Sequence, residues 1–198
     1  MSSLESVCVF CGSRPGADPV HAQTAHAFGR LLGERGLGLV YGGGGAGLMG
    51  AVADGALEAG GHVVGVIPRS MVEAERAHPG VVAKGEMLEV TTMHERKMLM
   101  HERSDAFVAL PGGVGTFEEV FEAIAWDQLD LHDKPIGFLN TGGFYAKLRE
   151  FIDSSHHAGF VPQTTHEVLA WGDTPESLLD EMQARAQVSR EPRLGLRW

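Results

Sequence analysis

The sequence has a deficit of positive charge, few cysteines and no long apolar run. Lysine and arginine number 16 against 26 aspartate and glutamate residues, which leaves a formal net charge of −10. That balance argues against a nucleic-acid binder that works through bulk electrostatics, but it leaves room for a local basic pocket. No apolar run reaches the roughly 18 residues of a membrane span, and the first residues lack the basic start and apolar core of a signal peptide. We therefore expect a cytoplasmic protein that binds neither membrane nor nucleic acid.

The only two cysteines, Cys8 and Cys11, form a Cys-x-x-Cys motif. Such a motif can be a redox pair or half of a zinc site. A redox pair opens a helix after a strand, whereas Cys8 lies inside the apolar run 7–11. No second pair of cysteines or histidines follows at zinc-ribbon spacing. We expect two buried thiols in a reducing compartment and no metal site.

What the sequence does contain is a regular alternation of strand-like and helix-like segments. The expected strands are 7–11, 37–41, 62–67, 86–90, 106–110, 135–139 and, more weakly, 167–169. The expected helices are 19–35, 48–59, 93–103, 116–129, 144–158 and 175–186. Continuous apolar strands that alternate with helices indicate an α/β fold with a parallel sheet covered on both faces. We expect one domain over 1–186 and a basic, flexible tail over 187–198.

Three glycine-rich segments follow predicted strands, at 12–16, 42–50 and 111–116. In open parallel sheets the ligand binds beyond the carboxyl ends of the strands, so these segments matter most. Glycine lets backbone N–H groups turn toward a ligand, and a following helix adds free N–H groups and the positive end of its dipole. A strand, a glycine loop and a helix in this order predict a cradle for a phosphate group.

The block 42–50, GGGGAGLMG, contains G-x-G-x-x-G twice, which is typical of dinucleotide binding. That fingerprint belongs after the first strand, and here it follows the second. It also calls for an acidic residue about 20 positions later, where this sequence ends a strand with Pro68 and Arg69. Arg69 would suit a 2′-phosphate, so an NADP-binding interpretation remains open. The other interpretation is that these glycines serve only close packing of helix against strand.

The segment 110–119, LPGGVGTFEE, is more specific. Pro111 ends a strand, the glycines expose backbone, and Thr116 is expected to open a helix. One interpretation is a capping box, in which Thr116 and Glu119 satisfy the first free N–H groups of that helix. Helical periodicity places 117, 120, 121, 124 and 128 toward the sheet and 119, 122 and 126 on the opposite face. Because this second face bears Trp126, we expect another subunit to cover it.

The segment 93–103, MHERKMLMHER, contains Met-His-Glu-Arg twice. Positions seven apart return to within about 20° of one helix face but lie roughly 10 Å apart along the axis. Only the first copy follows a strand directly, so Arg96 and Lys97 are the candidates for phosphate or carboxylate contact. We expect 101–103 to form a solvated or subunit-contact face, and the methionines to pack. His94 and His101 lie too far apart for one zinc ion.

The three motifs GGGGAGLMG, MHERK and PGGVGTFEE, in this order, resemble the Lonely Guy family of cytokinin riboside 5′-monophosphate phosphoribohydrolases, often labelled lysine decarboxylases. The resemblance covers about 7–186. It implies a Rossmann-like, doubly wound, mainly parallel sheet of about seven strands and usually a homodimer. It also implies hydrolysis of the N-glycosidic bond of a nucleoside 5′-monophosphate, AMP or a cytokinin nucleotide, to a free adenine-type base and ribose 5-phosphate, without a cofactor.

The family's catalytic arginine and glutamate match Arg96 and Glu119. The predicted substrate contacts are Ser13, Gly43, Gly44, Met93, Lys97, Gly112, Gly113, Val114, Gly115, Thr116 and Glu118. The stretch 73–89 is longer than is usual in the family, which leaves contacts to the base, such as one from His78, open. A decarboxylase that uses pyridoxal needs a Schiff-base lysine with a partner for the pyridinium, and none of the four lysines stands in such a setting.

Two other functions remain as alternatives. A non-catalytic nucleotide or cofactor carrier of the same fold, like the related molybdenum-cofactor carriers, would use the phosphate loop without a pair of Glu119 and Arg96. An NADP-dependent oxidoreductase is the third. The sequence does not predict whether AMP or an N6-prenylated nucleotide is preferred.

Overall fold

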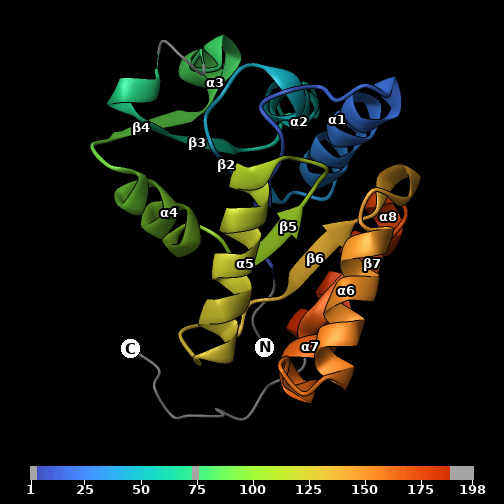
Figure 1. Ribbon diagram of the computed structural model, residues 1–198. Helices are drawn as coiled ribbons and strands as arrows, with labels where there is room; N and C mark the ends of the chain where they lie inside the picture. The colour runs from blue at the N-terminus through green and yellow to red at the C-terminus, as the bar shows by residue number, and fades with distance from the viewer. Residues whose placement is uncertain (1–3, 73–75, 188–198) are drawn as a thin grey trace.

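A single sheet of seven parallel strands forms the centre of the computed structural model, which describes residues 4–72 and 76–187 (Figure 1). The strands are β1 (Ser6–Phe10), β2 (Gly38–Tyr41), β3 (Val63–Pro68), β4 (Glu86–Val90), β5 (Ala106–Ala109), β6 (Ile136–Leu139) and β7 (Leu169–Gly172). They run in the order β4-β3-β2-β1-β5-β6-β7, with all neighbours parallel. The order reverses between β1 and β5. The predicted doubly wound, Rossmann-like sheet is confirmed.

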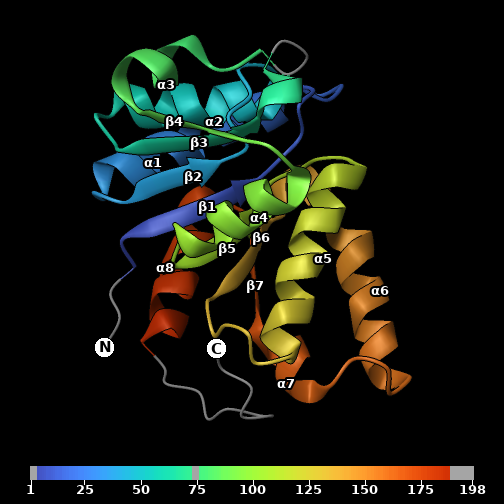
Figure 2. The ribbon, with the colours of Figure 1, turned by 90° about the vertical axis from the view of Figure 1, so that its left-hand side faces the viewer.

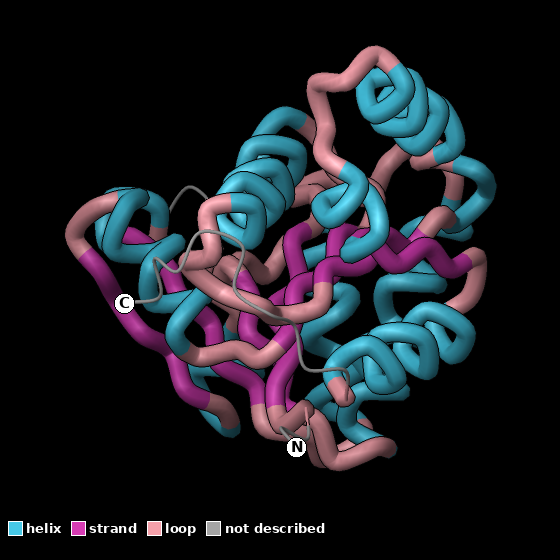
Figure 3. The backbone as a smooth tube through the Cα atoms, turned by 90° about the horizontal axis from the view of Figure 1, so that it is seen from below, coloured by secondary structure: helices cyan, strands magenta, loops and turns pink. Residues whose placement is uncertain are grey.

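Helices cover both faces of this sheet (Figures 2 and 3). The α-helices are α1 (Pro19–Glu34), α2 (Gly47–Glu58), α3 (Pro79–Lys84), α4 (Met93–Glu102), α5 (Val114–Gln128), α6 (Ala146–His157), α7 (Gln163–Val168) and α8 (Pro175–Ala186). Two short 3-10 helices, η1 (Arg69–Met71) and η2 (Thr141–Gly143), follow β3 and β6. None of the helices in the described part of the chain has the length and apolar character that a membrane crossing requires.

Side chains that alternate along β1 contribute to two separate apolar cores. Val7 and Val9 belong to the core beneath α1, α2, α3 and α8, whereas Cys8 and Phe10 belong to the core beneath α4, α5, α6 and α7. Cys11 faces the first of these cores, so the two cysteines lie on opposite sides of the sheet. Both thiols are free and buried, and burial raises the pKa of each above its usual range. The expectation of buried thiols is confirmed.

The main departures from the expected elements involve short helices. The segment 167–169, expected as a strand, contains the end of α7, and the strand β7 starts only at Leu169. The helices α3 and α7, of six residues each, were not expected, because they are too short to show helical periodicity. The predicted tail lies outside the described residues from 188 onward, as do 73–75 of the long stretch after β3.

Candidate active site

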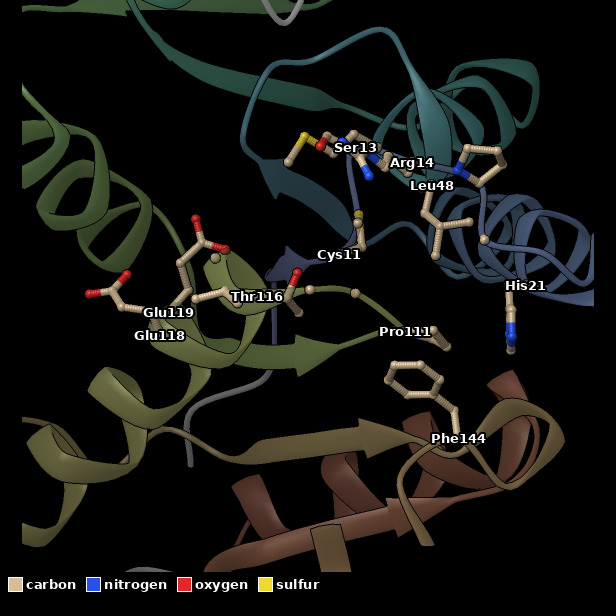
Figure 4. Close-up of a pocket in the computed structure, with 18 of the residues that line it drawn as sticks. Cys11, Ser13, Arg14, His21, Leu48, Pro111, Thr116, Glu118, Glu119 and Phe144 are labelled. Atoms are coloured by element: carbon tan, nitrogen blue, oxygen red, sulfur yellow. The ribbon is translucent and has the colours of Figure 1, made fainter. Parts of the chain in front are cut away.

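The carboxyl ends of β1 and β5 open into a cavity of about 600 Å³ (Figure 4). Its walls come from the loop after β1, the glycine loop after β5, and the first turns of α1, α2, α4 and α5. This is the topological switch point of the sheet, where ligands bind in folds of this kind. The predicted site residues that line the cavity are Ser13, Met93, Arg96, Gly112, Gly113, Val114, Gly115, Thr116, Glu118 and Glu119. Lys97, Gly43 and Gly44 are not part of this lining.

The start of α5 has no side-chain cap. Its N-cap residue is Gly113, and the helix begins at Val114, two residues before the expected start. Thr116 is therefore the third residue of the helix and cannot be its N-cap, so the capping box suggested for Thr116 and Glu119 does not form. Thr116 instead packs against Gly112, where an added Cβ would lie 2.1 Å from its hydroxyl oxygen. The helix N-terminus therefore opens into the cavity, as an anion-binding site requires.

Glu119 lies one turn into α5 and is only 8% exposed, with its side chain in the wall of the cavity. The sequence placed it on the face away from the sheet, and this was wrong. The buried face of α5 carries Thr116, Glu119, Val120, Ala123, Ile124 and Asp127, whereas Phe121 is 40% exposed and Gln128 is exposed. Apolar periodicity misplaced this face because polar residues occupy the part that borders the site.

Arg96 enters the cavity from the first turn of α4, which begins with a capping box. Thr92 accepts a hydrogen bond from the Glu95 N–H (3.1 Å), and the Glu95 carboxylate accepts from the N–H of Thr92 (3.2 Å). Arg96 is 2% exposed, and its Nη2 donates to the Gly42 carbonyl at 3.0 Å. An added Cβ at Gly42 would lie 1.9 Å from that nitrogen, so only glycine allows the guanidinium to approach this closely.

The rest of the glycine block 42–50 packs against neighbouring backbone. At Gly47 (φ +60°), an added Cβ would lie 2.4 Å from the Ser13 carbonyl carbon. The Gly43 carbonyl accepts a hydrogen bond from the His78 N–H (3.0 Å), and Gly44 forms an isolated antiparallel β-bridge with Ala77. These contacts agree with the close-packing interpretation of the block. It contributes to the site by positioning Arg96 and the loop after β1, and its residues Leu48 and Met49 line the cavity.

Lys97 faces two glutamates of α5. Its Nζ lies 2.5 Å from Glu118 Oε1 and 2.7 Å from Glu122 Oε2. Burial opposes the charged form of Lys97, but the hydrogen bonds to the two carboxylates outweigh it and raise the pKa of the ammonium group. Lys97 is therefore a cation that is held by protein carboxylates.

The second copy of the tetrapeptide is solvated only in part. His101 is 5% exposed, and its ring packs between Phe107 (4.4 Å) and Trp126 (4.5 Å between centroids). Burial is the main reason why the pKa of His101 falls to about 3. The prediction of a surface was correct only for Glu102 and Arg103, which are exposed. Trp126, which we expected a second subunit to cover, packs against this histidine of its own chain.

Several residues of the cavity had no signal in the sequence. His21, Met71 and Phe144 line it, and Phe144 meets the His21 ring edge-on at 5.8 Å (Figure 4). They come from segments that follow different strands and share no motif, so only the fold brings them together. His78, the suggested base contact, lies outside the lining. Its Nδ1 accepts hydrogen bonds from the first N–H groups of α3.

The fold and the cavity define a Rossmann-like α/β protein whose switch point combines an open helix N-terminus, a buried glutamate and a buried arginine. A protein-family model described as "Possible lysine decarboxylase" matches residues 49–182. A probable cytokinin riboside 5′-monophosphate phosphoribohydrolase of Oryza sativa subsp. japonica is 40% identical over 100% of this chain and 80% of its own length. A cytokinin riboside 5′-monophosphate phosphoribohydrolase of Arabidopsis thaliana is 42% identical over 100% of this chain and 85% of its own. The chain belongs to this Lonely Guy family of phosphoribohydrolases.

A molybdenum cofactor carrier protein from Chlamydomonas reinhardtii has a similar structure, with a TM-score of 0.68 and 19% identity over 91% of this chain and 96% of that one. At this identity the likeness shows a shared fold alone. The decarboxylase description fits none of the four lysines. Lys97 is paired with carboxylates, Lys134 donates to the His101 carbonyl, and Lys84 and Lys147 are exposed.

Proposed function

We propose that this protein hydrolyses the N-glycosidic bond of cytokinin riboside 5′-monophosphates, and of AMP, to a free adenine-type base and ribose 5-phosphate. The observation that carries the proposal is that Glu119 and Arg96 line the same cavity as the uncapped N-terminus of α5. The names and the 40–42% identity of the full-length relatives support it. The reaction adds water across a glycosidic bond and transfers no electrons, so it needs no organic cofactor.

The loop before α5 would hold the 5′-phosphate. The first N–H groups of a helix have no partner within the helix, and the helix dipole favours an anion at this end. Gly113 and Gly115 lie in open space, where an added Cβ would meet nothing within 4 Å. A phosphate can therefore reach this backbone without obstruction. Ser13, from the loop after β1, lies across the cavity as a further donor.

Glu119 would act where positive charge develops. Cleavage of the glycosidic bond passes through a sugar cation with oxocarbenium character, as in glycoside hydrolysis. A carboxylate beside the anomeric carbon stabilises this cation and can take a proton from the attacking water. Arg96 would hold the ribose or the phosphate and favour the ionised form of Glu119, because a nearby cation lowers the pKa of a carboxyl group.

A product assay on purified protein tests this proposal. The substrates are AMP, the other nucleoside 5′-monophosphates and an N6-prenylated AMP, and the free base is quantified by chromatography. Glu119→Gln should reduce base release by about 1,000-fold, the size expected for loss of acid–base catalysis, while AMP still binds in calorimetry. Glu150→Gln, at an exposed position of α6, serves as the control. Full turnover by the Glu119→Gln variant would exclude the assigned role, and binding without base release by the wild type would indicate a carrier.

We further propose that the protein works in the cytoplasm as a homodimer. Support for the dimer comes from exposed apolar side chains on the adjacent helices α4 and α5, where Met93 is 42%, Met98 47%, Val114 84% and Phe121 40% exposed. Large apolar side chains exposed on neighbouring helices are typical of a surface that another protein covers. Light scattering of the purified protein at several concentrations tests the dimer, and a monomer at all of them would contradict it.

A further inference from the structure

Lys97 and His101 of α4 both contact α5, and the two helices lie side by side in Figures 1 and 2. Lys97 of α4 bonds to Glu122 of α5, and His101 of α4 packs against Trp126 of α5. Lys97 and His101 are four residues apart, and so are Glu122 and Trp126. Side chains at this spacing occupy one face of a helix. The two helices therefore meet along matching faces, with an ion pair at the end near the cavity and a ring contact at the other.

The ion pair is partly withdrawn from water. Lys97 is 9% exposed, and the side chain of Glu122 is 23% exposed. The second carboxylate oxygen of Glu122, Oε1, is buried and has no hydrogen-bond partner among the described residues. The hydrogen bond from Lys97 to Glu122 Oε2 therefore stabilises this carboxylate. Removing one partner of such a pair is costly, because the other charge remains without compensation.

The ion pair also lies directly beside the groups that would carry out the reaction. Lys97 follows Arg96 in α4, and Glu118, its second partner, precedes Glu119 in α5. Glu118 lines the cavity, whereas Lys97 does not. Figure 4 shows the side chains of Glu118 and Glu119 leaving α5 in different directions. The Lys97 ammonium group thus links the two helices next to both reacting groups. Lys97 is adjacent in sequence to Arg96, and its partner Glu118 is adjacent in sequence to Glu119.

We propose that Lys97 is a positioning residue, which locks α4 to α5 through Glu118 and Glu122 and so holds the Arg96 guanidinium at its working distance from the Glu119 carboxylate. This proposal rests on the proposed hydrolase function and deepens it. It differs from a direct contact between Lys97 and the phosphate of the substrate, because a positioning residue acts on turnover and a phosphate ligand acts on binding.

The test measures turnover and phosphate binding separately in three variants. Lys97→Met removes the charge, and Lys97→Arg keeps a cation. Lys97→Met combined with Glu122→Met replaces the ion pair by an apolar contact, which proteins often tolerate well. This double variant keeps the test valid if Lys97→Met alone fails to fold. Lys147→Met, on the exposed face of α6, is the control. The readouts are kcat and KM for AMP and the Kd for ribose 5-phosphate, which carries the phosphate but no base.

For Lys97→Met we expect kcat to fall by up to about 100-fold, as a small misplacement of catalytic groups does, while the Kd for ribose 5-phosphate stays within about threefold. Lys97→Arg and the double variant should each recover part of kcat, because both restore a contact between the helices. A loss of ribose 5-phosphate affinity of about 10-fold or more that the double variant does not repair would identify Lys97 as a phosphate ligand and overturn the proposal. An unchanged kcat in Lys97→Met would also overturn it. A wild-type protein that releases no base overturns the proposed function itself.

Discussion

The two copies of Met-His-Glu-Arg have the same four residues and opposite environments. In the first copy the arginine is buried, since Arg96 is 2% exposed, and the methionine is half exposed at the edge of the cavity. In the second copy the arrangement is reversed. Met100 is 1% exposed in the core, and Arg103 is exposed and serves as the C-cap of α4.

The histidines and the glutamates differ in the same way. His94 is exposed, whereas His101 is enclosed by two aromatic rings. Glu95 closes the capping box at the start of α4, and Glu102 stands exposed in the last turn. Seven residues are nearly two full turns, so both copies occupy almost the same side of the helix. Their roles differ because one end of α4 borders the cavity and the other packs over β5. The environment thus decides what an identical peptide does, and each of the four residues offers a matched test.

The arginines should show the largest difference. We expect Arg96→Ala to lower kcat/KM for base release by about 1,000-fold, because it removes a buried, oriented cation from the site. Arg103→Ala should change it by less than about twofold, since the Arg103 contact with Glu86 is exposed and 3.5 Å long. Steady-state assays of both variants measure this. Equal losses in the two would mean that the second copy also takes part in the reaction.

The methionines should differ in stability. Met100→Ala leaves a cavity in the core beneath α4 and should lower the free energy of unfolding by roughly 2–5 kcal/mol. Met93→Ala should lower it by less than about 1 kcal/mol, because its side chain is 42% exposed. Urea denaturation of the two variants compares them. A loss of stability in Met93→Ala as large as that in Met100→Ala would contradict the difference in packing.

The histidines should differ in pH dependence. The pKa of His101 is lowered to about 3, so the unfolded chain binds a proton that the folded protein does not. The stability linked to this ring is fully present above about pH 6.5 and is lost as the pH falls from there toward 3. Between pH 8 and 5 the loss of folding free energy linked to His101 amounts to about 2 kcal/mol. His101→Phe should abolish this loss, and His94→Phe should leave it unchanged. Urea midpoints at both pH values measure it, and a wild-type pH dependence in His101→Phe would refute the assignment.

The features that could be predicted from the sequence are those that depend on local patterns. The β/α alternation, the parallel sheet and the loops at its carboxyl edge follow from apolar runs and glycine positions, which depend on local physics. The position of the first copy directly after β4 indicated that Arg96, and not Arg103, belongs at the ligand edge, and the structure places Arg96 in the cavity.

Other features depend on contacts between distant parts of the chain. No local pattern reveals that Trp126 packs against His101, or that Phe144 packs edge-on against His21. The burial of Glu119 was misread because a polar residue beside a site interrupts the apolar periodicity that marks a core. The capping box of Thr92 and Glu95, by contrast, is a local Thr-x-x-Glu pattern that can be recognised from the sequence alone.

The glutamates of the two copies should show the smallest difference. Glu95→Ala removes the carboxylate that accepts hydrogen bonds from the N–H groups of Thr91 (2.7 Å) and Thr92 (3.2 Å), and should lower the free energy of unfolding by about 1 kcal/mol. Glu102→Ala should change it by less than about 0.5 kcal/mol, and a slight gain is expected because an acid in the last turn opposes the helix dipole. Because the first turn of α4 carries Arg96, Glu95→Ala should also lower kcat modestly, whereas Glu102→Ala should not. Thermal unfolding together with the base-release assay tests both parts, and a stability loss in Glu95→Ala without any change in kcat would show that Arg96 is held by Gly42 and Lys97 and not by the cap.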